Sequence, residues 1–162
     1  INLKGSINSK DSIKKLSTYN PDLIISILGN EIFRKEIIGL PKLGLLNLHS
    51  SLLPKYRGLM PSFWVLKNKE KVTGVSLFFV DEGIDSGPIL LQRKIPIVNY
   101  SQKDLICLTK KVGMELIVSA LEILLKNEKI KCIENKKEDM TYYSFPTRSD
   151  VKKFLKGGNK FF

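Results

Sequence analysis

Two short apolar segments separated by a helical pattern constrain the fold of this chain more than any other feature. Residues 23–28 (Leu-Ile-Ile-Ser-Ile-Leu) and 43–48 (Leu-Gly-Leu-Leu-Asn-Leu) have the length and the nearly continuous apolar character of strands that are buried on both faces. Between them, residues 31–38 predict a short helix that ends at Gly39. Strands joined through a helix run parallel in one sheet. We therefore expect an α/β fold.

The rest of the chain predicts further strands and the helices that pack against them. Strands are expected at residues 75–80 and 89–95, and Pro96 places the second at a sheet edge because proline has no N–H to donate. In the longest predicted helix, Ser101 and Asp104 have the spacing of a capping box, and polar residues recur along one side. The helices are expected at residues 9–19, 61–67, 101–126 and 147–155.

The length of the chain limits the number of domains. Its 162 residues suffice for one domain with a substantial core, and two domains would be cramped. The sequence begins at Ile1, and residues 1–3 look like the end of a strand, so we expect residues 1–162 to be a single, N-terminally incomplete domain. No apolar run approaches the roughly 18 residues of a membrane-spanning helix, so no membrane partner is expected.

The charge and the cysteines restrict the partners and the cofactors. The formal net charge of +11 is compatible with an anionic partner such as RNA. However, all but four of the 27 basic residues are lysines dispersed along the chain, which favours a solvated surface over a basic RNA-binding module. Cys107 and Cys132 lack metal-ligand spacing, so we expect no metal site and two reduced core cysteines in a cytoplasmic protein.

Polar groups suited to catalysis lie at the end of the second apolar segment. Asn47 and His49 are two residues apart, so they project from one face at the C-terminal end of a strand, where open α/β sheets bind ligands. Asp85 follows the third expected strand in a glycine-rich turn. A histidine with a carboxylate can exchange protons near pH 7, and an asparagine amide can donate to a developing oxyanion. Without a nucleophile, these groups suit direct attack by an external amine on an activated acyl group.

The same residues could instead have structural roles or belong to another class of enzyme. His49 alone could be a satisfied core residue, and Asn47 and Asp85 could be ordinary capping and turn residues. A serine hydrolase using Ser50 or Ser51 would need a Gly-x-Ser-x-Gly turn, which the sequence lacks. One histidine and two distant cysteines do not make a zinc site, and a dinucleotide-binding glycine motif is absent as well.

The motif residues together resemble a known family. Residues 47–58 read Asn-x-His-x-Ser-Leu-Leu-Pro-x-Tyr-Arg-Gly, and residues 85–87 read Asp-x-Gly after a strand. This order, with 36 positions between His49 and Asp85, resembles the signature of formyltransferases that use 10-formyltetrahydrofolate. The resemblance is close over residues 20–97 and implies a Rossmann-like catalytic domain with a mostly parallel sheet and helices on both faces.

The resemblance implies a role for each matched residue. Asn47 would polarise the formyl oxygen, His49 would stabilise the tetrahedral oxyanion, and Asp85 would hold His49 and accept the amine proton through water. The folate N10 would be the leaving group. The implied pterin pocket comprises Gly29, Asn30, Ile32, Phe33, Leu45, Val80, Asp81, Glu82, Gly83 and Ile84. The implied substrate loop comprises Ser51, Leu53, Pro54, Tyr56, Arg57 and Gly58, with a cis bond before the proline as in relatives.

The sequence leaves the amine acceptor open. The segment Arg57-Gly58-Leu59-Met60-Pro61 has the Arg-Gly-x-x-Pro form of methionyl-tRNA and amino-sugar formyltransferases, although Leu59 and Met60 are bulkier than is usual in the methionyl-tRNA enzymes. We therefore expect methionyl-tRNA or a small nucleotide-linked amino sugar as the acceptor. Glycinamide ribonucleotide is kept as an alternative acceptor. It is less favoured, because the formyltransferases that use it have a different loop at this position. If the protein is not an enzyme, the alternative is a non-catalytic remnant that binds folate.

Overall fold

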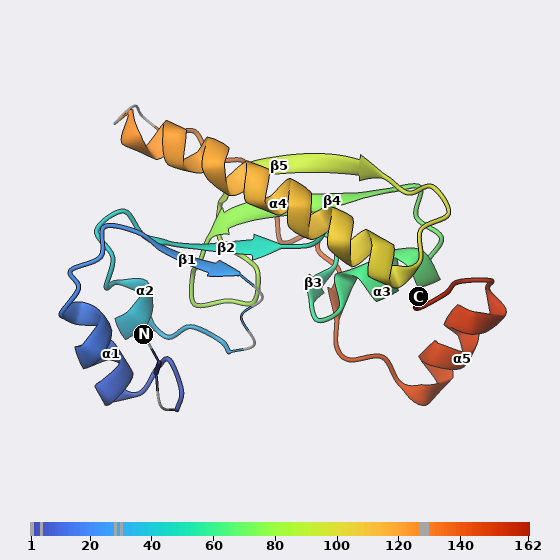
Figure 1. The fold of residues 1–162 in the computed structure, drawn as a ribbon, viewed down its shortest axis with the longest axis horizontal. Helices are drawn as coiled ribbons and strands as arrows, with labels where there is room; N and C mark the ends of the chain where they lie inside the picture. Colours follow the sequence, from blue (N-terminus) through green and yellow to red (C-terminus); the bar gives the residue numbers. More distant parts are fainter. Residues whose placement is uncertain (1, 4, 28, 30, 127–129) are drawn as a thin grey trace.

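A four-stranded mixed sheet forms the centre of the computed structural model, which describes residues 2–3, 5–27, 29, 31–126 and 130–162 (Figure 1). The strands lie in the order β1 (Ile24–Ile27), β2 (Leu45–His49), β4 (Val72–Phe79) and β5 (Ile89–Pro96). β1 and β2 are parallel, β4 is antiparallel to β2, and β5 is antiparallel to β4. Three of the four strands therefore share one direction. β5 lies at the edge of this sheet, as Pro96 predicted.

The helix α4 (Gln102–Leu125) covers one face of the sheet (Figure 1). Its capping box is formed as predicted, because the Ser101 hydroxyl accepts from the Asp104 N–H and the Asp104 carboxylate accepts from the Ser101 N–H. Leu116 and Ala120 of α4 pack with Leu46 in the largest apolar cluster. At the carboxyl end of β2, the loop that follows this strand covers the opposite face. None of the helices in the described part of the chain is long and apolar enough to span a bilayer.

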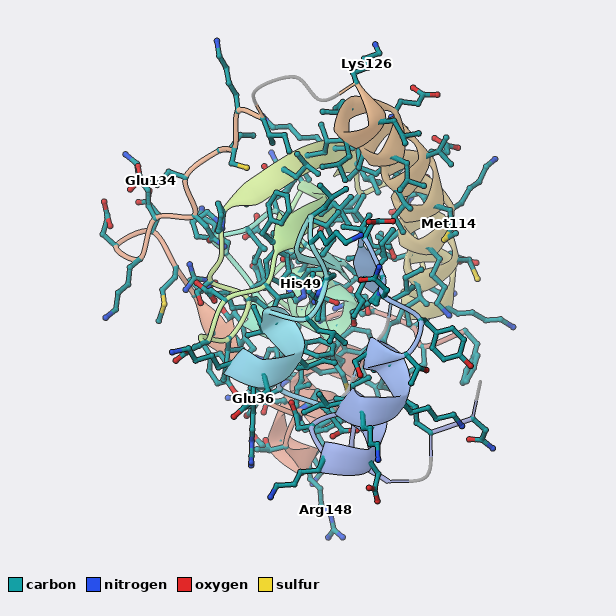
Figure 2. All side chains as sticks on the ribbon, turned by 90° about the vertical axis from the view of Figure 1, so that its left-hand side faces the viewer. Glu36, His49, Met114, Lys126, Glu134 and Arg148 are labelled. Carbon is teal, nitrogen blue, oxygen red and sulfur yellow. The ribbon has the colours of Figure 1, made fainter. Side chains whose placement is uncertain are left out.

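Two predictions about burial are wrong, the one for β1 and the one for the cysteines. β1 was expected to be fully buried, but it is an edge strand whose Ile27 is 43% exposed. The outer side of α4 carries the exposed apolar residues Met114 and Val118 beside its polar residues, and Met114 points away from the core in Figure 2. Cys107 and Cys132 are free but exposed. Apolar character shows which side chains can be buried, but it does not show which element covers them.

Four shorter helices flank the sheet. α1 (Lys10–Ser17) and α2 (Lys35–Ile38) lie at one end of the molecule, and α3 (Pro61–Lys67) and α5 (Arg148–Lys156) at the other (Figure 1). α2 is shorter than predicted, because residues 31–34 lie outside it and the Glu31 carboxylate instead accepts hydrogen bonds from Ser6 and Ile7. α3 and α5 pack through Phe63 and Phe154, whose rings stack with centroids 4.6 Å apart.

A two-stranded sheet joins two segments that are far apart in the sequence. β3 (Arg57–Gly58) pairs in parallel with β6 (Tyr142–Tyr143), so the end of the implied substrate loop is a strand. Gly58 has φ +93°, and a Cβ there would lie 2.3 Å from the Tyr143 carbonyl oxygen, so only glycine fits. The segment leading to β6 also forms an antiparallel bridge with β5 between Ile133 and Ile89. It therefore runs from the main sheet to the loop after β2.

Candidate active site

β2 directs Asn47 and His49 to the sheet face opposite α4. Leu46 and Leu48 belong to the apolar cluster under α4, and side chains alternate along a strand, so Asn47 and His49 project to the other side. His49 is only 7% exposed and lies in the interior of the molecule (Figure 2). The prediction that the two residues share a face at the end of a strand is confirmed.

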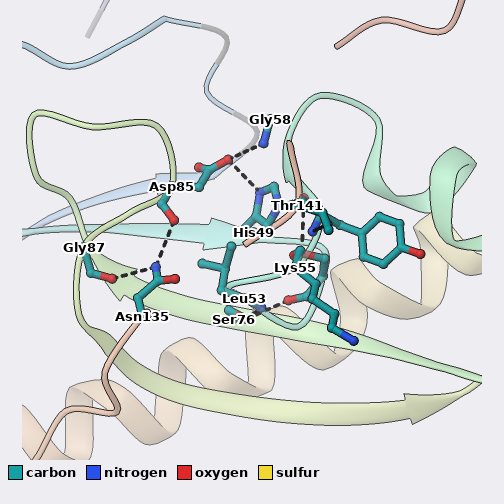
Figure 3. Close-up of polar contacts among 11 residues, drawn as sticks. His49, Leu53, Lys55, Gly58, Ser76, Asp85, Gly87, Asn135 and Thr141 are labelled. Carbon is teal, nitrogen blue, oxygen red and sulfur yellow. Dashed lines mark hydrogen bonds and ion pairs between the residues drawn. The ribbon is translucent and has the colours of Figure 1, made fainter. Parts of the chain in front are cut away.

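Hydrogen bonding determines which nitrogen of His49 carries the proton in the neutral ring. Nε2 lies 2.7 Å from the main-chain oxygen of Tyr56. A carbonyl oxygen only accepts, so Nε2 must be the donor, and Nδ1 then holds the lone pair. Nδ1 lies 3.6 Å from Oδ2 of Asp85 (Figure 3). Asp85 is therefore within reach of the imidazole, as the sequence predicted.

The carboxylate of Asp85 is held by the loop after β2. Its Oδ2 accepts a hydrogen bond from the Gly58 N–H at 2.8 Å, and the side chain is 14% exposed (Figure 3). Asp85 itself has φ +47°, a left-handed conformation that non-glycine residues rarely adopt. Within the same turn, Asp81 accepts hydrogen bonds from the Gly83 N–H at 3.0 Å and the Ser86 hydroxyl at 2.6 Å. Asp81 therefore shapes the turn.

A cavity of ≈ 280 Å³ has Asn47 and Asp85 in its wall. Asn30 lies outside the described residues. Leu45 does not line the cavity, because it is 1% exposed and its carbonyl accepts from the Val80 N–H at 2.7 Å. Asp81 and Glu82 do not line it either. The predicted pocket residues that do line it are Gly29, Ile32, Phe33, Val80, Gly83 and Ile84. Glu31, which belongs to the same segment of the implied pocket, lines it too, and three further lining residues were not predicted: Leu59, Phe78 and Tyr142.

Most side chains of the predicted substrate loop lie outside the cavity and hold its walls in place. The bond between Leu53 and Pro54 is cis, as the resemblance implied. The Leu53 N–H donates to the Ser76 hydroxyl at 3.0 Å, and that hydroxyl donates to the Ser51 carbonyl at 2.6 Å (Figure 3). Of the six predicted loop residues, Gly58 lines the cavity. The loop therefore positions β2 and the acidic turn.

Tyr56 contributes its carbonyl group to the site, and its phenol lies elsewhere. The hydroxyl donates to Glu70 at 2.7 Å and accepts from Asn68. Burial of the ring, with a further contribution from Glu70, raises the pKa of Tyr56 far above its ordinary value. The phenol therefore stays protonated and holds the loop to the residues after α3.

Three residues near the site come from the segment after α4 and were not identified from the sequence. Asn135 binds the turn of Asp85, Thr141 accepts from the Tyr56 N–H at 2.8 Å, and Tyr142 lines the cavity. This segment is polar and lacks periodicity, so nothing in it indicated a contact 50 to 85 positions back along the chain. Among the residues that the structure describes, no group of three or more His, Cys, Asp and Glu side chains could hold a metal ion.

Comparison with known proteins gives a consistent result. Residues 4–121 match the family model described as formyl transferase. The methionyl-tRNA formyltransferase of Thermodesulfovibrio yellowstonii is 46% identical over 117 residues, which cover 70% of this chain and 37% of the relative. That of Kosmotoga olearia is 37% identical over 149 residues, covering 90% of this chain and 47% of the relative. The chain thus spans between a third and a half of the length of these two relatives.

Solved structures share the fold. WlaRD, a sugar 3N-formyl transferase crystallised in the presence of dTDP and 5-N-formyl-THF, is 29% identical with a TM-score of 0.70. The match covers 83% of this chain and 48% of WlaRD. HypX from Aquifex aeolicus, crystallised with tetrahydrofolic acid, has a TM-score of 0.77 at 19% identity, covering 85% of this chain and 24% of HypX. At that identity the likeness concerns the fold alone, and it agrees with the α/β, Rossmann-like architecture.

Proposed function

Because the chain belongs to the formyl transferase family, we propose that the protein transfers the formyl group of 10-formyltetrahydrofolate to a primary amine. The observation that carries this proposal is the arrangement of three groups. Nδ1 of His49 lies 3.6 Å from the Asp85 carboxylate, and Asn47 and Asp85 lie in the wall of one cavity. These are the groups that acyl transfer to an external amine requires.

The cavity is compatible with the pterin ring of the formyl donor. Its volume of ≈ 280 Å³ is close to the lower end of ligand pockets, about 300–1,000 Å³. Ile32, Phe33 and Ile84 supply apolar walls for a flat ring, and the main chain at Gly83 and Ile84 supplies polar groups for its edge. The presence of 5-N-formyl-THF in the WlaRD structure supports this assignment.

The chemistry assigns one step to each residue. 10-Formyltetrahydrofolate supplies the formyl carbon, and its N10 is the leaving group. The Asn47 amide donates to the formyl oxygen as that oxygen becomes an oxyanion. Because the lone pair of neutral His49 is at Nδ1, we assign the acceptance of the amine proton to His49, in place of Asp85, and Asp85 stabilises the resulting cation. The new carbon–nitrogen bond forms, the bond to N10 breaks, and the proton passes to N10.

We propose the amino group of methionyl-tRNA as the acceptor, in the cytoplasm. The methionyl-tRNA formyltransferases of T. yellowstonii and K. olearia are 46% and 37% identical to this chain, whereas the sugar formyltransferase WlaRD is 29% identical. A nucleotide-linked amino sugar is the second candidate, because the bulky Leu59, which is unusual in the methionyl-tRNA enzymes, lines the cavity beside Gly58. The two candidates differ greatly in size, so one assay separates them.

The test uses the protein encoded by the complete reading frame. It is incubated with 10-formyltetrahydrofolate and, separately, methionyl-tRNA, uncharged tRNA, a dTDP-linked amino sugar and glycinamide ribonucleotide, and the products are identified by mass. We expect formylation of methionyl-tRNA, with uncharged tRNA as the negative control. Formylation of the sugar alone would replace the acceptor. Folate binding without transfer to any amine would indicate a non-catalytic module, and absence of folate binding would overturn the proposal.

A further inference from the structure

We infer that Asn135 is a positioning residue for Asp85, an inference that rests on the function proposed above. Asn135 does not line the cavity and lies beyond residues 4–121, the part of the chain that matches the family model. Its side chain nevertheless holds the main chain of the turn that carries the acidic residue of the site (Figure 3).

The amide nitrogen of Asn135 binds two carbonyl groups of this turn. Nδ2 donates to the main-chain oxygens of Asp85 and Gly87, each at 2.9 Å. These carbonyls lie on either side of Ser86, so one carboxamide fixes the conformation of the end of the turn. Asp85 is the residue with φ +47°, and such a conformation persists only where the surroundings enforce it. The two hydrogen bonds of Asn135 provide that restraint.

Arg57 determines the orientation of the Asn135 amide. Nη2 of Arg57 donates to Oδ1 of Asn135 at 2.7 Å and to its main-chain oxygen at 3.1 Å. A guanidinium group only donates and a carbonyl only accepts, so the amide oxygen must face Arg57 and the NH₂ group must face the turn. Arg57 is 5% exposed, and the ion pairs found among the described residues do not include it. Loss of the Asn135 oxygen would leave this buried cation poorly solvated.

Both residues of β3 therefore hold Asp85, one by a direct hydrogen bond and the other through Asn135. The Gly58 N–H binds the carboxylate directly, and Arg57 binds the main chain of the same residue through Asn135. The first contact aims Oδ2 and the second fixes the Cα from which the side chain extends. Asn135 is itself placed between the bridge of Ile133 to β5 and the pairing of β6 with β3. With both contacts in place, Oδ2 lies 3.6 Å from Nδ1 of His49.

The test compares Asn135→Asp with a matched control in the complete protein. Asn135→Asp keeps the shape and the acceptors for Arg57 but loses both donations to the turn. The control is Asn159→Asp, because the Asn159 amide also donates to a main-chain oxygen, that of Phe154 at 3.2 Å, and does not line the active-site cavity. We expect kcat for Asn135→Asp to fall on the order of 100-fold, with KM for the donor nearly unchanged. The control should keep its kcat.

Two further measurements separate positioning from a merely structural role. In an Asp85→Ala background, Asn135→Asp should have little additional effect on kcat, because it acts through Asp85. Exchange of the Gly58 amide proton, followed by NMR, should accelerate on the order of tenfold in Asn135→Asp and not in Asn159→Asp. If Asn135→Asp fails to fold, Asn135→Gln, which retains the carboxamide on a longer stem, takes its place in both measurements.

The possible outcomes are distinct. Equal losses of kcat in the wild-type and Asp85→Ala backgrounds, or unchanged Gly58 exchange, would overturn the inference while the proposed function stands. An inactive wild-type protein would overturn the proposed function. The exchange of Gly58 would still decide whether Asn135 positions the carboxylate.

Discussion

At the scale of single residues, the hydrogen bond on the far side of His49 decides how this side chain can act. With Nε2 donating to the Tyr56 carbonyl, the lone pair of the neutral ring is at Nδ1, on the side of Asp85. The distance of 3.6 Å exceeds that of a direct hydrogen bond, so the imidazole and the carboxylate are neighbours that are not hydrogen-bonded to each other. A proton on Nδ1 would give the ring a donor toward the carboxylate.

The first prediction follows from this pair. His49→Ala and Asp85→Ala should each lower kcat for formyl transfer by about 10²–10⁴-fold, the usual contribution of a general acid–base residue. The double variant should lose far less than the product of the two, because the residues act as a unit. Asp22→Asn is the matched control, since Asp22 is exposed and its carboxylate forms a surface ion pair with Lys42, away from the site. Near-normal kcat in both single variants would show that the assignment is wrong.

Some residues of the site could be predicted from the sequence and others could not. Asn47 and His49 could be predicted because a period of two on a strand fixes their common face. Leu45 lies on the same face of the strand, but neighbouring residues cover it. Alternation along a strand shows which face a side chain is on, and it does not show whether that side chain is exposed. Asn135 and Tyr142 could not be identified, because their relation to the site exists only after a distant segment has docked.

At the scale of elements, the ends of the helices α4 and α5 are specified locally. Ser101 with Asp104 and Thr147 with Asp150 both form complete capping boxes. These contacts lie within four consecutive residues, which is why the start of both helices could be read from the sequence. The hydrogen bond from the Thr147 hydroxyl, followed by that from its N–H, holds the pKa of Asp150 below its usual value of 3.8.

The second prediction is a pH dependence of stability. A pKa that is lower in the folded state means that ionised Asp150 stabilises the fold above pH 3.8 and that this contribution is lost as the pH falls through the folded-state value. Asp150→Asn should therefore have a lower Tm than the wild type at pH 7, and the difference should shrink below pH 3.8. Thermal unfolding followed by circular dichroism measures this. The exposed Asp139→Asn is the control, and a difference in Tm that does not depend on pH would contradict the prediction.

The third prediction concerns the packing of α3 against α5. Phe63 is fully buried and stacks on Phe154, so Phe63→Ala should lower the free energy of unfolding by about 3–5 kcal/mol. Phe145→Ala, at a side chain that is 67% exposed, should change it by less than about 0.5 kcal/mol. Urea denaturation provides both values. Similar effects for the two variants would mean that α5 does not pack on α3 as described.

At the scale of the whole molecule, the charge is spread and not collected into one surface. Lysines occur on α1, α4 and α5, which lie in different parts of the molecule (Figure 1). Recognition of RNA usually needs a continuous basic track with aromatic residues for stacking. We therefore expect the net charge of +11 to attract polyanions without selecting among them.

The fourth prediction tests this charge distribution. The chain of 162 residues by itself should bind tRNA weakly, and the affinity should decrease with salt and be equal for methionyl-tRNA and uncharged tRNA. Filter binding or fluorescence anisotropy at 50 and 200 mM salt measures this. Tight binding at physiological salt that discriminates methionyl-tRNA from uncharged tRNA would show that a selective surface exists on this chain.

The overall architecture could be predicted further than its details. Apolar runs, caps and prolines gave the order of the strands and helices and the parallel pair β1 and β2. The pairing of β3 with β6 could not be predicted, because a two-residue strand has no periodicity and its partner is remote. The exposure of β1 and of the outer side of α4 depends on which elements lie beside them, and composition does not encode that.

The dependence of residues 56–58 on residues 141–143 has a consequence for the order of folding. The hydrogen bond from the Tyr56 N–H to Thr141 closes a loop of 85 positions, and long loops form late because closure costs chain entropy before any contact is gained. β2 and the acidic turn leave the ribosome well before residue 141 is synthesised. A nascent chain therefore contains Asn47, His49 and Asp85 before these residues have their final arrangement, which is complete only when residues 141–143 dock.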